Sequence, residues 1–261
     1  KVRAAGRKVY CNAGSLDEVR AAMAAGAEGI GVLRTEFLFM GRDAMPTEEE
    51  QRALYSDALK ACSGKPLIIR LLDIGGDKAL PYLPMPAEDN PYLGVRGVRF
   101  LLEHTELLET QLRAIAGAAS AVPGSQARIM IPMVCTVEEV RRVREMLVSV
   151  AGEDAPVALG IMIETPAAVL NAAELASVCD FFSLGTNDLT QYVMAADRGN
   201  AAVSALYDPF SPAVLRAVAM TVEAAHAAGI PVGICGELAS DPAATDWLLA
   251  AGLDSLSLSR M

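Results

Sequence analysis

The stretch FFSLGTNDLTQYVMAADRGN occupies residues 181–200 of this 261-residue chain. It begins with a mostly apolar run, 181–185, that has the length of a buried strand, and then turns polar at Thr186-Asn187-Asp188 before a helix-like pattern begins. Arg198 follows ten residues after Asp188, so an amide, a carboxylate and a guanidinium lie on one excursion from the strand end. An apolar strand with such a tip predicts a site for a small anionic ligand and a metal ion.

The same alternation of strand and helix patterns continues along the whole chain. Between Ala/Leu-rich helical patterns lie eight strand candidates, at residues 8–12, 29–34, 67–72, 128–134, 158–164, 180–186, 231–235 and 253–258. Repeated strand–helix units predict a parallel sheet, and eight of them in a chain of about 250 residues predict the α/β class with a (β/α)8 TIM-type barrel. We expect residues 1–261 to form a single barrel domain. Because the chain ends just past the eighth strand, we also expect its closing C-terminal helix to be missing.

Start and stop signals bracket the predicted helices. Three segments fit the capping box, in which a hydroxyl and a glutamate each satisfy a backbone amide: 15–18, 47–50 and 136–139. Ser211-Pro212 and Asp241-Pro242 place a capping side chain before a proline at the first helical position. Glycines stand where helices should stop, at Gly26, Gly64, Gly229 and Gly252.

Composition and charge exclude several classes of function. The net charge is −10 and no basic run is present, which argues against a nucleic-acid groove. The longest apolar stretches have the length of strands, so no membrane insertion is expected. Five scattered cysteines without CxxC spacing argue against disulfides or zinc and favour a cytoplasmic setting. The chain begins with Lys1 and shows no signal peptide, which suggests a piece of a longer protein.

Reactive residues gather at the predicted carboxyl ends of the strands, where barrel enzymes form their active sites. Arg34 and Arg70 follow the second and third strands, and Arg198 adds another guanidinium; such planar groups bind phosphate and carboxylate in a bidentate manner. The alternative is a salt bridge at the rim, for instance from Arg34 to Glu36 or Asp73. Arg96 and Arg99 lie close together, and either could be a solvated charge at a helix start. Arg96 ends an unusually long loop, 73–96, and Arg99 follows it. We expect this loop to cover the site.

Glu164 and Asp188 end the fifth and sixth strands, and two such carboxylates can offer oxygen ligands to one Mg²⁺. Asp188 could instead cap a helix that begins at Leu189. Cys235 is the one cysteine at a strand end, between glycines, where it suits a proton donor or acceptor rather than a core group. His104 and His226 fall within helical patterns, which disfavours Cys-His catalysis.

Seven motifs, in this order, resemble one known family: GVLRTEFLFMGRDAMPTEEEQ (31–51), RLLDIGGDKALPY (70–82), NPYLGVRGVR (90–99), IMIETPAA (161–168), FFSLGTNDLTQY (181–192), DRGN (197–200) and GICGELASDP (233–242). They are similar to the phosphoenolpyruvate-binding C-terminal barrel of Enzyme I of the bacterial sugar phosphotransferase system. The resemblance to pyruvate phosphate dikinase and phosphoenolpyruvate synthase is more distant.

The resemblance implies Mg²⁺-dependent transfer of the phosphoryl group of phosphoenolpyruvate to a histidine, with release of pyruvate, as the first step of sugar uptake. By matching motif positions, it implies that Arg34, Arg70, Arg198, Asn187 and Asp188 bind substrate, with Arg96 near the phosphate. It further implies that Glu164 and Asp188 hold the metal. Cys235 would be the acid that protonates the enolpyruvate carbon.

The same resemblance implies partners. The acceptor histidine would sit on a separate N-terminal phosphohistidine domain, absent from this chain, which would pass the phosphoryl group to HPr, and the barrel would form a homodimer. Neither His104 nor His226 lies in such a context. The alternatives are the barrel of a multidomain phosphoryl-transfer protein or of a dikinase-type enzyme, a non-catalytic binding or dimerisation module, and a Mg²⁺-dependent lyase or aldolase of the citrate-lyase type. The thiol and the phosphate-suited arginines speak against the lyase.

Overall fold

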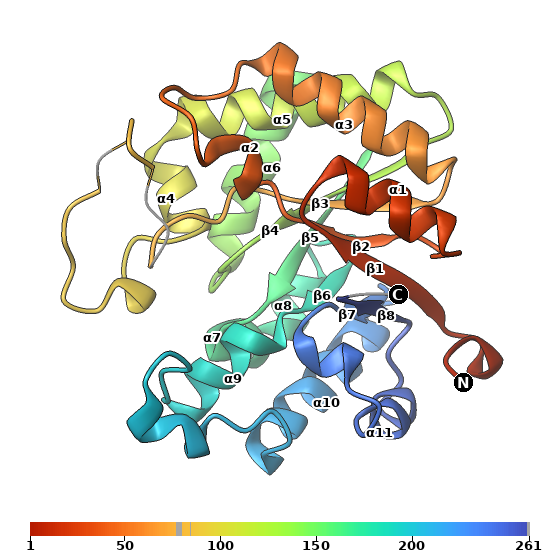
Figure 1. Cartoon of the computed structure of the whole chain (residues 1–261), viewed down its shortest axis with the longest axis vertical. Coiled ribbons are helices and arrows are strands. Elements are labelled where there is room, and N and C mark those ends of the chain that lie inside the picture. The colour runs from red at the N-terminus through yellow and green to blue at the C-terminus, as the bar shows by residue number, and fades with distance from the viewer. Residues whose placement is uncertain (77–79, 84, 260–261) are drawn as a thin grey trace.

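A computed structural model describes residues 1–76, 80–83 and 85–259. Eight parallel strands pair in sequence order and close into a barrel (Figure 1). The strands are β1 (Lys8–Ala13), β2 (Ile30–Leu33), β3 (Pro66–Arg70), β4 (Gln126–Ile131), β5 (Val157–Ile163), β6 (Phe182–Leu184), β7 (Val232–Ile234) and β8 (Ser255–Leu258). The barrel closes where β1 pairs with β8, in a register that sets Lys8 beside Ser255 and Cys11 beside Leu258.

All eight predicted strands are confirmed, with ends that differ by a few residues. The predicted end of β6 is two residues too late: the strand stops at Leu184 because the chain enters a helix at Thr186. The polar tip of the opening stretch therefore lies on the first turn of a helix rather than on the strand itself. This places Asn187 and Asp188 over the mouth of the barrel.

In Figure 1, helices lie above, to the left of and below the barrel, while β1 runs along its right side from the N-terminus. They are α1 (Leu16–Ala24), α2 (Glu36–Phe39), α3 (Glu48–Cys62), α4 (Val98–Glu103), α5 (Thr105–Ala121), α6 (Val137–Ala151), α7 (Pro166–Leu170), α8 (Ala172–Ala176), α9 (Thr186–Met194), α10 (Pro212–Ala227) and α11 (Thr245–Ala250). Short 3₁₀ segments are η1 (Arg3–Ala5), η2 (Pro91–Leu93), η3 (Ala201–Leu206) and η4 (Glu237–Ser240). Within the part of the chain that the structure describes, no helix is both long enough and apolar enough to cross a membrane.

Most of the predicted helix signals work as expected. The capping boxes of Thr47 and Thr136 are complete. Ser15 accepts from the Glu18 amide, but the Glu18 carboxylate accepts from the Gly14 amide instead of completing the box. The prediction that a helix starts at Asp241-Pro242 is wrong: a turn held by the Asp241 carboxylate comes first, and α11 begins at Thr245.

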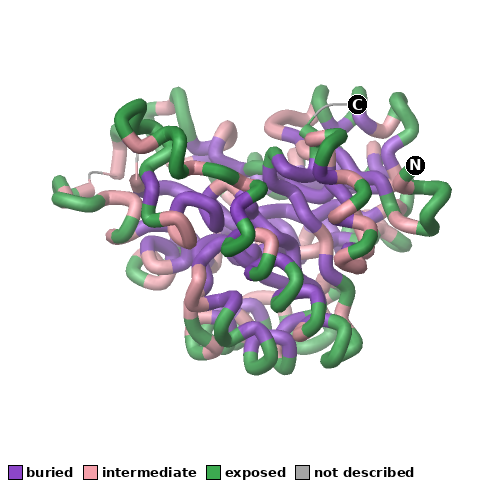
Figure 2. Tube along the Cα trace, turned by 90° about the horizontal axis from the view of Figure 1, so that it is seen from below, coloured by how far each residue is buried: buried purple, intermediate pink, exposed green. Residues whose placement is uncertain are grey.

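The core has two parts. The larger one lies between the outer faces of the strands and the helices, and the buried backbone of Figure 2 runs through the middle of the molecule with exposed segments outside it. The smaller one lies inside the barrel and consists of Val32, Ile68, Met130, Met162, Phe181 and Cys235. Cys235 belongs to this inner layer. Its thiol therefore lies at the bottom of the space enclosed by the carboxyl ends of the strands.

Candidate functional site

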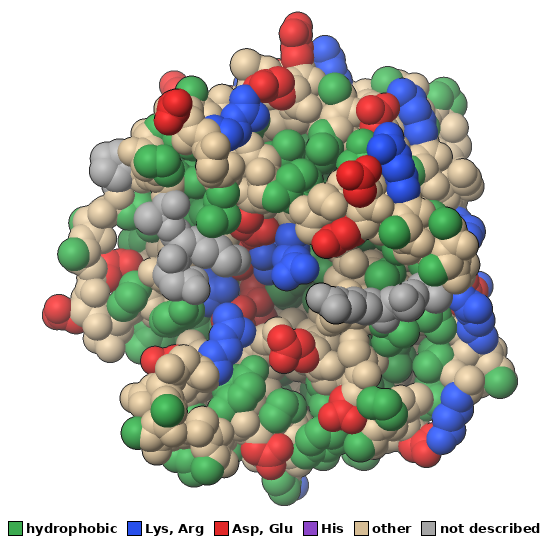
Figure 3. Space-filling model, viewed as in Figure 1, with side chains coloured by type: hydrophobic (Ala, Val, Ile, Leu, Met, Phe, Trp, Pro, Cys, Tyr) green, Lys and Arg blue, Asp and Glu red, His purple; other side chains and the backbone are tan. Residues whose placement is uncertain are grey.

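A cavity of about 200 Å³ opens at the carboxyl ends of the strands. Figure 3 looks onto this face, where acidic and basic side chains gather around a central hollow. The eight site residues predicted from the sequence all line the cavity: Arg34, Arg70, Arg96, Glu164, Asn187, Asp188, Arg198 and Cys235. Strands and loops that are far apart in sequence therefore bring these side chains to one place, as the barrel topology requires.

Asp188 lies on the first turn of α9, and its carboxylate faces inward. The helix begins at Thr186, so the alternative in which Asp188 caps a helix starting at Leu189 is wrong. Instead, both carboxylate oxygens of Asp188 accept from Arg96, each at 3.0 Å. Such a bidentate pair fixes both side chains in one geometry.

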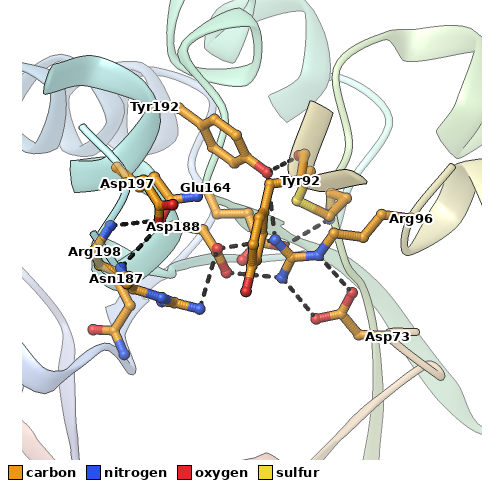
Figure 4. Close-up of polar contacts among 12 residues, drawn as sticks. Asp73, Tyr92, Arg96, Glu164, Asn187, Asp188, Tyr192, Asp197 and Arg198 are labelled. Atoms are coloured by element: carbon orange, nitrogen blue, oxygen red, sulfur yellow. Dashed lines mark hydrogen bonds and ion pairs between the residues drawn. The ribbon is translucent and has the colours of Figure 1, made fainter. Parts of the chain in front are cut away.

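Arg96 is the most deeply placed cation of the site, at 4% exposure. Its guanidinium also donates to Asp73, with Nη2–Oδ2 at 3.2 Å, and lies 5.8 Å from the ring centre of Tyr92 (Figure 4). Tyr192 accepts from it at 3.3 Å and donates to the Tyr92 carbonyl. The interpretation of Arg96 as a solvated helix-start charge is therefore wrong. Both ends of the long 73–96 loop reach the site through these contacts.

Arg70, at the end of β3, is held by two buried carboxylates. Its guanidinium lies 2.5 Å from Glu36 Oε1 and 3.3 Å from Asp73 Oδ2. Burial alone would lower the pKa of Arg70, but Glu36 and Asp73 outweigh it and raise that pKa, so the side chain stays charged. The rim salt bridge proposed for Arg34 is made by Arg70 instead. Among the described residues no carboxylate pairs with Arg34, which remains exposed beside the cavity.

Asn187 and Arg198 border the outer side of the cavity. The Asn187 Oδ1 accepts from the Glu237 amide at 2.9 Å, so its NH₂ group is the part left to serve a ligand. Its carbonyl accepts from Tyr207 at 3.0 Å. Arg198 lies 3.6 Å from Asp188 with a side chain that is 37% exposed, which makes it the more mobile of the two cations on Asp188.

Glu164, directly after β5, is almost fully buried, at 1% exposure. Its Oε1 accepts from the Met133 amide at 2.7 Å. Burial raises the pKa of Glu164, and the neighbouring carboxylates of Asp188 and Asp73 raise it further. Gly185 is required beside it, because a side chain at this position would press against Glu164 Oε2 and Met162. A nearby positive charge would therefore stabilise the ionised form of this carboxylate.

The charges of the buried part of the site suit a divalent cation. Within the described residues, the carboxylates of Glu36, Asp73, Glu164 and Asp188 are buried together with the two guanidiniums of Arg70 and Arg96. This leaves an excess of negative charge, which adds to the effect of burial in raising the pKa of Glu164. No group of three or more His, Cys, Asp or Glu side chains able to hold an ion occurs in the described ranges. Glu164 and Asp188 both line the cavity, and their carboxylate oxygens are ligands of the kind that hard divalent cations take.

Cys235 closes the floor of the cavity at 8% exposure. Burial raises the pKa of its thiol to about 11, while the Ser183 hydroxyl acts in the opposite direction. The thiol donates weakly to the Leu184 carbonyl at 3.6 Å. A thiol with a pKa raised in this way keeps its proton at neutral pH, which makes Cys235 a candidate proton donor. No histidine lies among the described residues that line the cavity; His104 stands at the α4–α5 junction and stacks on Phe100.

The buried polar residue that supports the segments carrying Arg34 and Arg70 left no direct sign in the sequence. Gln111 of α5 is fully buried; its amide donates to Thr35 at 3.2 Å and to Tyr55 at 3.1 Å, and its oxygen accepts from the Leu72 amide at 3.0 Å. Thr35 in turn donates to the Arg70 carbonyl at 2.9 Å. Gln111 thus links the segments that follow β2 and β3. A glutamine on the apolar face of a helix is the one signal that would have found it.

Relatives of known name cover nearly all of the chain. It is 49% identical over 261 residues to a phosphoenolpyruvate-protein phosphotransferase of Geobacillus stearothermophilus, with 97% of this chain and 44% of the relative covered. It is 51% identical over 254 residues to a multiphosphoryl transfer protein of Rhodobacter capsulatus, with 97% of this chain and 30% of the relative covered. The chain therefore spans less than half the length of these relatives.

Solved structures support the fold. A citrate lyase of Burkholderia xenovorans aligns with a TM-score of 0.61 at 17% identity and covers 97% of this chain and 73% of its own. At that identity the likeness is one of the barrel alone. A family model described as "PEP-utilising enzyme, PEP-binding domain", PEP being phosphoenolpyruvate, matches residues 3–261. With this match over almost its whole length, the chain belongs to the PEP-utilising enzyme family and corresponds to its PEP-binding domain.

Proposed function

We propose that this chain is the phosphoenolpyruvate-binding and dimerisation domain of a phosphoenolpyruvate-protein phosphotransferase. In that role it takes part in moving the phosphoryl group to a histidine of a separate domain and releases pyruvate, the first step of sugar uptake. The observation that carries the proposal is the cavity itself, which combines four guanidiniums, two carboxylates suited to a metal and a neutral thiol. Phosphoryl transfer needs positioning and charge neutralisation more than covalent help, and this set supplies both.

The arginines and Asn187 hold the substrate. Arg34 and Arg198 have the freest guanidiniums at the cavity and bind the phosphate and carboxylate oxygens. The buried Nε of Arg70 has no partner in the described structure, so it is a further donor for a ligand oxygen. Asn187 donates its NH₂ group, since its oxygen is engaged by Glu237. Arg96, held between Asp73 and Asp188, adds charge near the phosphate.

Glu164 and Asp188 are the residues that would hold Mg²⁺, which neutralises negative charge on the phosphate and the developing enolate. Both are hard oxygen ligands within one cavity, and Met133 fixes Glu164 through its second oxygen. Glutamine in place of Glu164 would keep that hydrogen bond while removing the charge.

Cys235 supplies the proton that completes the reaction. When the phosphorus–oxygen bond breaks, the enolate oxygen keeps the bonding electrons, and the methylene carbon then takes the proton from Sγ. A thiol whose pKa is near 11 keeps its proton at neutral pH until such a strong carbon base forms. The proton is later replaced from solvent.

The phosphoryl acceptor comes from outside the cavity, because no described lining residue is a histidine. A separate phosphohistidine domain fits this need, and with it HPr as the next acceptor. The relatives' names fit either a phosphoenolpyruvate-protein phosphotransferase or a multiphosphoryl transfer protein as the parent. We propose a cytoplasmic setting for both.

Calorimetric titration with phosphoenolpyruvate tests the binding role. We expect binding that requires Mg²⁺ and that falls by at least about tenfold in Arg34→Gln, since hydrogen bonds to charged groups contribute about 1.5–3 kcal/mol. Arg20→Gln, on the outer surface of α1, is the matched control and should bind normally. Absence of Mg²⁺-dependent binding by the unmodified chain would refute the proposal.

A further inference from the structure

The barrel has a second cavity, at the end opposite to the candidate site. It measures about 170 Å³ and is lined by residues at or near the amino ends of the strands, among them Lys8, Tyr10, Arg128, Phe181, Asp254 and Ser255. Barrel interiors are usually filled by layers of bulky branched side chains. Here β2 and β7 place Gly31 and Gly233 in the lining, opposite the serines of β8, so this part of the interior is lined by small residues.

Neither glycine can be replaced by a larger residue unless the serine hydroxyl opposite it moves. A side chain at Gly31 would collide with the Ser257 hydroxyl, and one at Gly233 would collide with the Ser255 hydroxyl. Ser257 is engaged, because it donates to Asn12 at 2.6 Å. The Ser255 hydroxyl makes no hydrogen bond with the described residues and faces the cavity.

Arg128 is the cation of this cavity, and its charge is not neutralised by the part of the chain that the structure describes. It is a half-buried residue of β4 whose guanidinium lies 5.8 Å from the ring centre of Phe181, without a carboxylate partner in the described ranges. In a chain of net charge −10, an inward-facing arginine without a partner is unusual. A cation–π contact with the Phe181 ring does not use the guanidinium N–H groups as hydrogen-bond donors to an oxygen, so these remain for a ligand.

The one carboxylate among the described lining residues is already engaged. Asp254 lies 3.2 Å from Arg7 and 3.0 Å from His226, and it also accepts from the Val232 amide. Lys8, at the rim, pairs with Glu28 at 3.1 Å. What remains facing the cavity is a set of donors: the Arg128 guanidinium and the hydroxyls of Tyr10 and Ser255.

We propose that this lower cavity is a binding site for a small oxyanion of the size of inorganic phosphate. Arg128 supplies the charge and a bidentate pair of donors, and Tyr10 and Ser255 complete the contacts. The site is separated from the upper cavity by the inner layer that contains Ile68, Met130 and Met162. It is independent of the proposed reaction and does not use its residues.

Backbone amide NMR on the whole chain, titrated with inorganic phosphate, distinguishes the two cavities. We expect saturable shifts of Gly31 and Gly233 at the lower cavity, separate from those of Gly185 and Gly236 at the upper one. Arg128→Met should weaken the lower response by about tenfold or more and leave the upper response unchanged. Tyr10→Phe removes one hydroxyl with little change of shape and should weaken it less.

Arg20→Met, which removes an exposed arginine of α1, is the matched control and should change neither response. If Gly31 and Gly233 do not respond to phosphate in the unmodified chain, the proposal is wrong. It is equally wrong if Arg20→Met weakens the lower response as much as Arg128→Met, because general charge would then account for it. If Arg128→Met does not fold, Tyr10→Phe is the test. An unchanged response of the lower cavity in Tyr10→Phe would then overturn the proposed contacts.

Discussion

At the scale of single residues, the neutral thiol of Cys235 leads to a prediction about the reaction. Cys235→Ala removes the proposed proton donor but only a small part of the cavity wall. In the full-length parent protein, we expect pyruvate formation to fall by about 10²–10⁴-fold, the usual contribution of a general acid, while calorimetric phosphoenolpyruvate binding is retained. Cys179→Ala, at a buried thiol away from the cavity, is the matched control. Pyruvate formation at the normal rate in Cys235→Ala would remove the acid role.

Arg96 leads to a second prediction, because it neutralises Asp73 and Asp188 together. In Arg96→Met, Asp73 keeps only Arg70 and Asp188 keeps only the more exposed Arg198, so the unfolding free energy should fall by up to about 3–5 kcal/mol. A divalent cation at the cavity would recover part of that loss. We therefore expect Mn²⁺ to raise the melting temperature of Arg96→Met more than that of the unmodified chain.

Arg99→Met is the control for this comparison. Arg99 lies on the same segment but donates to the Leu93 and Gly94 carbonyls rather than to a carboxylate. Its response to Mn²⁺ should equal that of the unmodified chain. An equal response of Arg96→Met would mean that Asp188 is not a metal ligand.

At the scale of elements, α5 holds the segments after β2 and β3 in place through Gln111. Gln111→Leu keeps the volume of the side chain but leaves the Leu72 amide without its acceptor and Thr35 without its donor. We expect a loss of about 1–3 kcal/mol in denaturant unfolding, the cost of unsatisfied buried polar groups. Phosphoenolpyruvate binding should weaken as well, because Thr35 lies between Arg34 and Glu36.

Thr110→Ala tests whether this effect is specific. Thr110 precedes Gln111 on α5, but its hydroxyl only donates to the Glu106 carbonyl on the exposed side of the helix. We expect a change within about 0.5 kcal/mol and normal binding. If both variants behave alike, α5 acts by helix stability and not through the buried glutamine.

At the scale of the whole molecule, buried thiols predict sensitivity to alkali. Burial raises the pKa of Cys62 and of Cys179 to about 12, whereas an unfolded chain releases these protons near pH 8.5. The native state therefore holds more protons than the unfolded state above that pH. Their stabilising contribution is complete below about pH 8.5 and is lost as the pH rises toward 12, by up to about 1.4 kcal/mol per pH unit for each thiol.

Denaturant unfolding between pH 8 and 11 measures this slope. Cys62→Ala removes one titrating group, so its unfolding free energy should fall less steeply with pH than that of the unmodified chain. Cys135→Ala, at a partly exposed thiol, is the control. Equal slopes for Cys62→Ala and the unmodified chain would exclude the buried thiol as the cause.

The sequence predicted the barrel and the members of the site for a simple reason: apolar runs mark strands, and the topology brings their carboxyl ends together. It did not predict the pairings among those members. The bidentate contact of Arg96 with Asp188 joins residues that are 92 positions apart in the sequence. The ion pair between Arg70 and Glu36 joins residues that are 34 positions apart. Such contacts form only where distant segments meet at the mouth of the folded barrel, and no local pattern encodes them. Gln111 was missed because its role arises only where three segments meet.

The pairing of β1 with β8 has a consequence for biosynthesis. Lys8 and Ser255 become neighbours across 247 positions of sequence, so the barrel closes through its most distant contact. On a ribosome, β1 emerges before the other strands of the barrel, and its free edge must wait until β8 has been made. An unpaired edge during that interval invites mispairing with other nascent chains. Translation speed and chaperone capture, rather than the stability of the finished barrel, would then govern how much of this protein reaches the closed state.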